Sequence, residues 1–183
     1  FILQTAALKA EGLVGKILVT GCLSQRYQNM ILEEMPEVDG ILGTGSYTEI
    51  VPAIEARLGD KIVEDFGDID APEEECGRIL TTPEHYAWLK IAEGCDNKCA
   101  YCVIPRIRGG HRSRPQANIL REVRALVEQG CREINLIAQD TTYYGMDKWE
   151  QKATKTSGVD SARGESLASL LREINDLPGD FWV

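Results

Sequence analysis

The chain has 183 residues, of which 43% are hydrophobic and 27% charged, and its formal net charge is −9. This length allows one full domain or parts of two, and an acidic chain gains little from phosphate neutralisation, which disfavours nucleic-acid binding. The sequence shows no secretory signal and no membrane-spanning stretch, so we expect a cytoplasmic protein with no membrane partner.

The first sixty residues alternate between strand and helix patterns. Residues 16–20 and 38–42 predict two short strands. A helix should follow each strand, the first capped by Ser24 and stopped by Pro36, the second opened by a capping box over 46–49. The expected apolar stripe of the second helix consists of Ile50, Val51, Ile54 and Leu58. This βαβα order predicts a parallel α/β layer.

An acidic stretch separates the two halves of the sequence. Residues 64–80 lose apolar side chains and gain Asp and Glu, which is typical of a linker. We therefore expect a first domain over 1–63 and a second over 81–183.

The second half again alternates strands with helices. Strands are predicted over 86–92 and 133–138, a helix begins at Pro115, and a polar stretch over 146–165 precedes another helix. The expected core positions of the two helices are Ile119, Leu120, Val123, Leu126, Val127, Leu167, Leu170, Leu171, Ile174 and Leu177. Residues 181–183 (Phe-Trp-Val) read as the opening of a third strand. The resulting βαβαβ order fits the first units of a TIM-like barrel, in which chemistry lies at the carboxyl ends of the strands.

Three of the six cysteines, Cys95, Cys99 and Cys102, lie within eight residues. Thiolates at this spacing can converge on one iron–sulfur cluster, and three ligands instead of four leave one iron open for a substrate or cofactor. Six cysteines in such a chain suit metal binding in a reducing compartment better than a disulfide framework. The spacing alone also allows a structural zinc site or three unrelated reduced cysteines, although no second ligand pair exists and His85 and His111 are not at finger spacing.

Two other polar segments can be interpreted either as ordinary turns and loops or as binding sites. Residues 43–45 (Gly-Thr-Gly) could bind an anion at a helix start, but a tight turn is favoured because no Gly-rich phosphate fingerprint is present. A basic cluster follows the cysteines and could be a solvated loop or a wall facing an anionic group. Its members are Arg106, Arg108, His111, Arg112 and Arg114.

The residues around the cysteines resemble a known family. Tyr101, an aromatic residue directly before the last cysteine, is similar to the cluster loop of radical S-adenosylmethionine enzymes, and residues 91–95 and 102–115 resemble the methylthiotransferases among them. Residues 137–145 (Ile-Ala-Gln-Asp-Thr-Thr-Tyr-Tyr-Gly) resemble the branch that modifies an aspartate of a small-subunit ribosomal protein. The tRNA-modifying branch tends to carry Gly-Gln-Asn at this strand end. The similarity runs from about Leu8 to Val183.

This resemblance implies a [4Fe–4S] cluster on the three loop cysteines, with S-adenosylmethionine as cofactor. It implies that Gln139, Asp140 and Thr141 help to hold the amino group of the cofactor, although a polar cluster at a strand end otherwise usually forms a turn. Tyr101 would pack near the adenine, or would simply cover the loop. No residue of this chain is assigned as a catalytic group.

A fourth cysteine gains a role only through the resemblance. Taken alone, Cys22 after a buried strand would most often be an inert core thiol. The methylthiotransferases hold an auxiliary [4Fe–4S] cluster with three cysteines of their N-terminal domain. Residues 20–23 resemble the segment around the third of these, which would make Cys22 that ligand and place the other two before Phe1. The chain would then be an interior piece of a longer protein, without that cluster and inactive alone. Cys76 and Cys131 receive no role.

The expected function is that of a radical S-adenosylmethionine methylthiotransferase. It would add a methylthio group to the β carbon of an aspartate of a small-subunit ribosomal protein, using an electron donor such as flavodoxin or ferredoxin. One alternative is a tRNA adenosine methylthiotransferase with the same chemistry, and another is a non-catalytic module with a structural metal. The acidic charge balance favours the protein substrate over tRNA.

Overall fold

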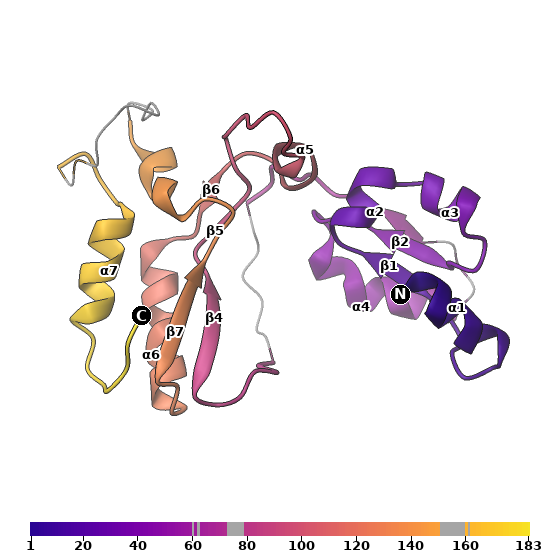
Figure 1. Ribbon diagram of the computed structural model, residues 1–183, viewed down its shortest axis with the longest axis horizontal. Coiled ribbons are helices and arrows are strands. Elements are labelled where there is room, and N and C mark those ends of the chain that lie inside the picture. Colours follow the sequence, from indigo (N-terminus) through magenta and orange to yellow (C-terminus); the bar gives the residue numbers. More distant parts are fainter. Residues whose placement is uncertain (60, 62, 73–78, 151–159, 161) are drawn as a thin grey trace. The chain divides into compact units, whose positions relative to one another are not determined.

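The computed structural model describes residues 1–59, 61, 63–72, 79–150, 160 and 162–183. The chain forms two compact units, Phe1–Cys76 with Arg106–Arg108, and Gly77–Pro105 with Gly109–Val183 (Figure 1). The division after Cys76 lies inside the acidic stretch. Over the described part of the chain, no helix is long and apolar enough to cross a bilayer.

The first unit is built on a three-stranded parallel sheet in the order β1-β2-β3. Its strands are β1 (Leu18–Thr20), β2 (Gly40–Leu42) and β3 (Val63–Asp65). Its helices are α1 (Ile2–Ala10), α2 (Cys22–Tyr27), α3 (Met30–Glu34), the 3-10 helix η1 (Tyr47–Glu49) and α4 (Ile50–Leu58). Parallel strands require crossover connections, and helices supply both of them here. The predicted parallel α/β layer is therefore confirmed, and its third strand extends into the first residues of the expected acidic stretch.

The prediction that Ser24 caps a helix is wrong. α2 begins at Cys22, and Ser24 lies buried inside it, with its hydroxyl near the carbonyl oxygens of Gly21 (2.8 Å) and Leu42 (2.5 Å). The helix then ends early because Gln28 adopts a left-handed backbone conformation (φ 44°).

The predicted capping box at Ser46 is also absent. The N–H of Glu49 donates to the Ser46 carbonyl oxygen (3.1 Å) and closes a 3-10 turn, so that N–H is not available to the serine hydroxyl. α4 consequently begins one turn later. It buries Ala53, whereas Val51, Ile54 and Leu58 of the predicted apolar stripe are exposed.

The second unit is built on two parallel strands, β4 (Tyr86–Lys90) and β7 (Glu133–Ile137). A separate antiparallel pair joins β5 (Ala92–Glu93) to β6 (Arg112–Ser113). Trp182 makes a parallel bridge to Glu133 and so adds a third parallel segment beside β7. The remaining elements of this unit are α6 (Gln116–Glu128), η2 (Thr141–Tyr143), η3 (Met146–Lys148) and α7 (Leu167–Asn175). The short helix α5 (Ile104–Arg108) is divided, because Arg106–Arg108 belong to the first unit.

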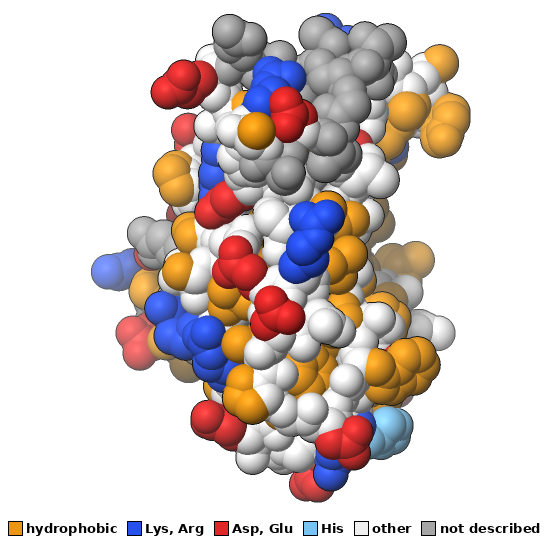
Figure 2. All heavy atoms as spheres, turned by 90° about the vertical axis from the view of Figure 1, so that its left-hand side faces the viewer, with side chains coloured by type: hydrophobic (Ala, Val, Ile, Leu, Met, Phe, Trp, Pro, Cys, Tyr) orange, Lys and Arg blue, Asp and Glu red, His pale blue; other side chains and the backbone are white. Residues whose placement is uncertain are grey.

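Helices α6 and α7 pack on one face of the β4–β7 pair, and the core of the unit lies between them (Figure 1). The buried core residues of the two helices are Ile119, Leu120, Val123, Leu126, Leu170 and Ile174, as predicted. Leu171 instead is 40% exposed, and Trp88 on β4 is 47% exposed. On the face of the molecule turned to the viewer in Figure 2, acidic and basic side chains both lie among hydrophobic ones.

Candidate active site

Two loops follow the carboxyl ends of the neighbouring strands β4 and β7. The cysteine loop, residues 94–102, comes after the short strand β5 that continues from β4, and the second loop begins at Gln139 directly after β7. The two loops touch, because Asn97 Nδ2 donates a hydrogen bond of 2.7 Å to Asp140 Oδ2. They therefore open on the same side of the sheet, as the strand order predicts.

The three cysteines of this loop are free thiols with different exposure. Cys95 is buried, Cys102 is half-buried and Cys99 is exposed. The sulfur of Cys95 accepts a hydrogen bond from the backbone N–H of Asn97 (3.4 Å). Within the described ranges, no three His, Cys, Asp or Glu side chains lie close enough to hold a metal ion. The three thiols share one loop, and their role as cluster ligands stays a prediction.

The entry to the cysteine loop is packed against the Gly109–Gly110 backbone. Cys95 N donates to Gly109 O (3.2 Å), and Gly94 has a φ of 74°. A Cβ atom at Gly94 would overlap the carbonyl oxygens of both glycines. Only glycine therefore allows this close approach, which fixes where the loop begins.

His111 holds the other side of the loop. Its backbone N–H donates to Asp96 Oδ1 (2.9 Å), and its buried ring stands edge-on to Tyr143, with ring centroids 5.2 Å apart. Its Nε2 lies 3.2 Å from Ser113 Oγ, whereas its buried Nδ1 has no hydrogen-bond partner among the described residues. Burial lowers the pKa of His111 despite the attraction of nearby carboxylates, so the ring is neutral.

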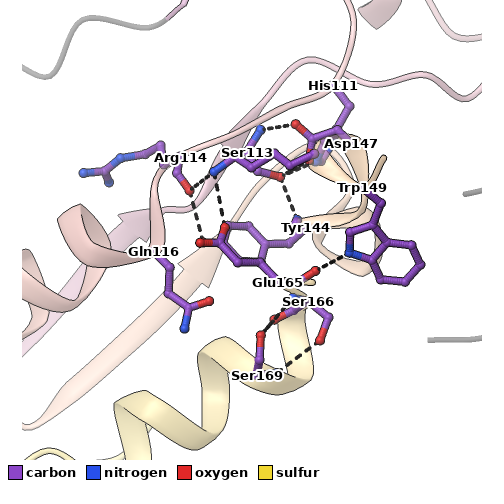
Figure 3. A network of polar contacts seen from close by, with 12 residues as sticks. His111, Ser113, Arg114, Gln116, Tyr144, Asp147, Trp149, Glu165, Ser166 and Ser169 are labelled. Carbon is purple, nitrogen blue, oxygen red and sulfur yellow. Dashed lines mark hydrogen bonds and ion pairs between the residues drawn. The ribbon is translucent and has the colours of Figure 1, made fainter. Parts of the chain in front are cut away.

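A polar network extends from Ser113 to the segment after β7 (Figure 3). Ser113 contacts Asp147 through its hydroxyl and its backbone N–H, and Gly145 N donates to Ser113 Oγ (2.8 Å). The fully buried Tyr144 donates its hydroxyl to Arg114 O (3.1 Å), and burial raises the pKa of that phenol, which keeps it protonated. These bonds fasten β6 to the loop that carries the predicted cofactor residues.

The predicted cofactor residues differ in whether their polar atoms are already hydrogen-bonded within the chain. Gln139 Oε1 is buried and has no hydrogen-bond partner among the described residues. Asp140 is largely used within the chain, because its Oδ1 accepts from Thr142 N (3.1 Å) and Thr142 Oγ1 (2.6 Å) and caps η2. Burial raises the pKa of Asp140, but the hydrogen bonds from Thr142 and Asn97 outweigh burial and leave the pKa lowered. Thr141 opens η2, and Tyr101 is 94% exposed.

Cys22 lies in the other unit. It occupies the first turn of α2 and is half-buried, and its sulfur accepts a hydrogen bond from Arg108 Nε (3.2 Å), a residue of the same unit. Thr44 in the Gly-Thr-Gly segment donates its backbone N–H to Gln25 Oε1 (2.9 Å), which supports the tight-turn interpretation.

Other residues singled out in the sequence have structural partners. Arg114 of the basic cluster donates to Lys90 O (2.6 Å) and pairs with Glu122 (2.8 Å), so its guanidinium is bound within the chain. Cys131 is buried, and its sulfur donates to Glu133 O (3.2 Å). Cys76 lies outside the described residues.

Three residues that organise this edge were not identified from the sequence, namely Asn97, Ser113 and Asp147. Asn97 stands among the cysteines, where only the cysteine spacing was informative, and Asp147 falls in the polar stretch after β7. The hydrogen bonds of these residues join positions that are 43 and 34 residues apart, so no local sequence pattern predicts them.

Comparison with known proteins adds an independent finding. Residues 89–175 match the family model of the radical SAM superfamily. The chain is 47% identical over 174 residues to the "Ribosomal protein uS12 methylthiotransferase RimO" of Akkermansia muciniphila, which covers 92% of this chain and 38% of that protein. Proteins of the same name from Desulforamulus reducens and Lachnoclostridium phytofermentans are 51% identical over 150 residues and 43% identical over 183 residues. These matches cover 80% and 100% of this chain, but only 33% and 39% of those proteins.

Proposed function

Through residues 89–175 this chain belongs to the radical SAM superfamily, and from that premise we propose that the whole protein is a methylthiotransferase acting on ribosomal protein uS12. Its product would carry a methylthio group on the β carbon of an aspartate. The observation that carries the proposal is the 47% identity to a uS12 methylthiotransferase over 92% of the chain. The cysteine loop lies beside the Gln139 loop at the carboxyl ends of parallel strands, which suits a catalytic cluster in a barrel.

We propose that Cys95, Cys99 and Cys102 hold a [4Fe–4S] cluster. Thiolates are the usual ligands of such clusters, and the N–H of Asn97 at the Cys95 sulfur is a donor of the kind that stabilises a thiolate. When bound, the cluster and S-adenosylmethionine supply one-electron chemistry that no side chain can provide. The chain itself supplies the ligands, their orientation and a site from which water is excluded.

The residues present also fit the cofactor. An ammonium group has three donors and no acceptor, and no described residue donates a hydrogen bond to the buried Gln139 Oε1, which is an acceptor. Binding the amino group of S-adenosylmethionine there would remove the cost of leaving that oxygen unpaired. Asp140 would add negative charge beside the ammonium, Thr141 would place the turn, and the exposed ring of Tyr101 would be free to stack on the adenine.

The remaining parts of the proposal concern the whole protein. Cys22 would be the third ligand of an auxiliary [4Fe–4S] cluster, and a small redox protein such as flavodoxin or ferredoxin would deliver electrons. The parallel segment at Trp182 beside β7 supports a barrel that continues from β4 and β7. The reduced cysteines that such clusters need favour a cytoplasmic location.

Anaerobic reconstitution of the chain with iron and sulfide tests the metal. We expect about one oxygen-sensitive cluster per chain. C95A, C99A and C102A should each abolish it, whereas C131A should retain it because that thiol contacts backbone oxygens of His85 and Glu133. Tight stoichiometric zinc that survives in air would contradict the proposal and favour a structural module.

A second experiment tests the substrate. The complete reduced protein is incubated with uS12 and, separately, with tRNA, and both are analysed by mass spectrometry. We expect methylthio incorporation into an aspartate of uS12 only, because the net charge of −9 on this part of the protein opposes the dense phosphate charge of tRNA. Incorporation into tRNA alone would overturn the substrate and leave the chemistry intact.

A further inference from the structure

Asn97 makes two contacts that point in different directions. Its backbone N–H donates to Cys95 Sγ (3.4 Å), and its side-chain Nδ2 donates to Asp140 Oδ2 (2.7 Å). The first contact reaches a cysteine that the proposed function makes a cluster ligand. The second reaches across to the loop that follows β7.

Asp140 is a fixed anchor for the Asn97 side chain. Its other carboxylate oxygen accepts from the backbone N–H and the hydroxyl of Thr142, so the carboxylate cannot rotate without breaking these bonds. It also caps η2, the next element after β7. The position of Asn97 is therefore set by the sheet edge and not only by the cysteine loop.

A hydrogen bond to a cluster sulfur has a known electronic effect. Reduction adds one electron to the cluster, and an N–H dipole aimed at a thiolate ligand stabilises the extra negative charge. The potential of an iron–sulfur cluster therefore rises with such bonds and falls when they are lost.

We propose that Asn97 and Asp140 form a positioning pair that holds the Asn97 N–H on the Cys95 sulfur and thereby raises the reduction potential of the cluster. This inference rests on the proposed function, since it requires the cluster on Cys95. Neither residue needs to touch the cofactor for this role.

The test is a redox titration of the reconstituted chain with dithionite, which supplies the electron, followed by electron paramagnetic resonance without S-adenosylmethionine. N97A removes the side chain that is anchored, keeps the backbone N–H and leaves the charge unchanged. We expect its midpoint potential to be more negative than that of the wild type. N135A is the matched control, because Asn135 also donates its amide to a carboxylate, that of Glu133 (2.9 Å), and should not shift the potential.

A double-mutant cycle separates anchoring from charge, because D140A also removes a negative charge. Once Asp140 is absent, N97A should cause no further shift in the midpoint potential. The double variant N97A/D140A should therefore have the same midpoint potential as D140A. Equal potentials in N97A and wild type would overturn the inference, as would a full N97A shift in the D140A background. If N97A takes up no iron, iron content becomes the readout, and retention of full iron by D140A overturns the pair. A wild-type chain without a cluster would overturn the proposed function as well.

Discussion

Ser113 and Asp147 are joined by two hydrogen bonds, one from the serine hydroxyl to Oδ1 (2.5 Å) and one from the serine backbone N–H to Oδ2 (3.0 Å). The same hydroxyl oxygen accepts from the N–H of Gly145 (2.8 Å). One buried side chain thus connects β6 with the segment around η3, where the loop after β7 ends (Figure 3). The position of the Gln139 loop depends on this connection.

We expect S113A to destabilise the chain by about 1–3 kcal/mol, because it leaves the Gly145 N–H without its acceptor in a buried place. The midpoint of urea unfolding measures the loss. S46A is the matched control. Ser46 is also buried, but its hydroxyl has no hydrogen-bond partner among the described residues, so its removal should be close to neutral. Equal losses in the two variants would contradict the role given to Ser113.

Asp39 should make the stability of the first unit depend on pH. Burial raises the pKa of its carboxyl, but hydrogen bonds from Lys9, from the Ile17 backbone N–H and from Arg57 outweigh burial and lower the pKa from 3.8 to about 2. A carboxyl whose pKa is lower in the folded state adds stability that is present above pH 3.8 and lost as pH falls towards 2. We expect D39N to be less stable by about 2 kcal/mol at pH 6.

The gap between wild type and D39N should close as the pH falls from 5 to 2. Urea unfolding at several pH values measures it. A gap that stays constant over this range would show that the lowered pKa of Asp39 does not contribute to stability.

Ser166 and Ser169 begin α7 with a reciprocal capping box. Ser169 N donates to Ser166 Oγ (3.2 Å), and Ser166 N donates to Ser169 Oγ (2.8 Å). We expect S166A to cost about 1 kcal/mol and S166D to retain most of the stability, because aspartate also caps helices. Thermal unfolding compares the two variants. An S166D chain as unstable as S166A would mean that packing, and not capping, is lost.

The sequence predicted the elements whose signal lies in many residues. The apolar period of α6 and most of α7 was read correctly, because several side chains per helix repeat the same face. Signals that depend on one or two residues failed. A serine pattern suggested a capping box at Ser46, where a 3-10 turn forms, while the real box at Ser166 went unrecognised because its second member is serine and not glutamate.

In the candidate site, too, the overall arrangement was predicted from the sequence, whereas individual contacts were not. The strand order predicted that both loops would lie at the carboxyl ends of the strands, and Asn97 and Asp140 do touch there. The sequence did not predict that Asp140 would be used by Thr142 and Asn97, because such bonds depend on tertiary placement. Nor could spacing tell the buried Cys95 from the exposed Cys99.

The last prediction concerns the protonation of His111. Because the Ser113 hydroxyl gives its hydrogen to Asp147, the 3.2 Å contact to the histidine requires a donor, so Nε2 carries the proton. Nδ1 is then an acceptor without a partner among the described residues, and a second proton there would place a charge in a buried site. Burial accordingly lowers the pKa of His111 below 6.5.

This lowered pKa has a definite sign for stability. Below pH 6.5 the unfolded chain binds a proton that folded His111 does not, so stability falls as the pH falls. We expect the stability of wild type relative to H111Q to decrease from pH 7 to pH 5. The chain has two histidines, so nitrogen-15 shifts of the imidazole rings report the tautomer and pKa directly, with H85Q to assign the signals. A His111 that titrates at or above 6.5, or that protonates Nδ1 first, would overturn this account of the Ser113 network.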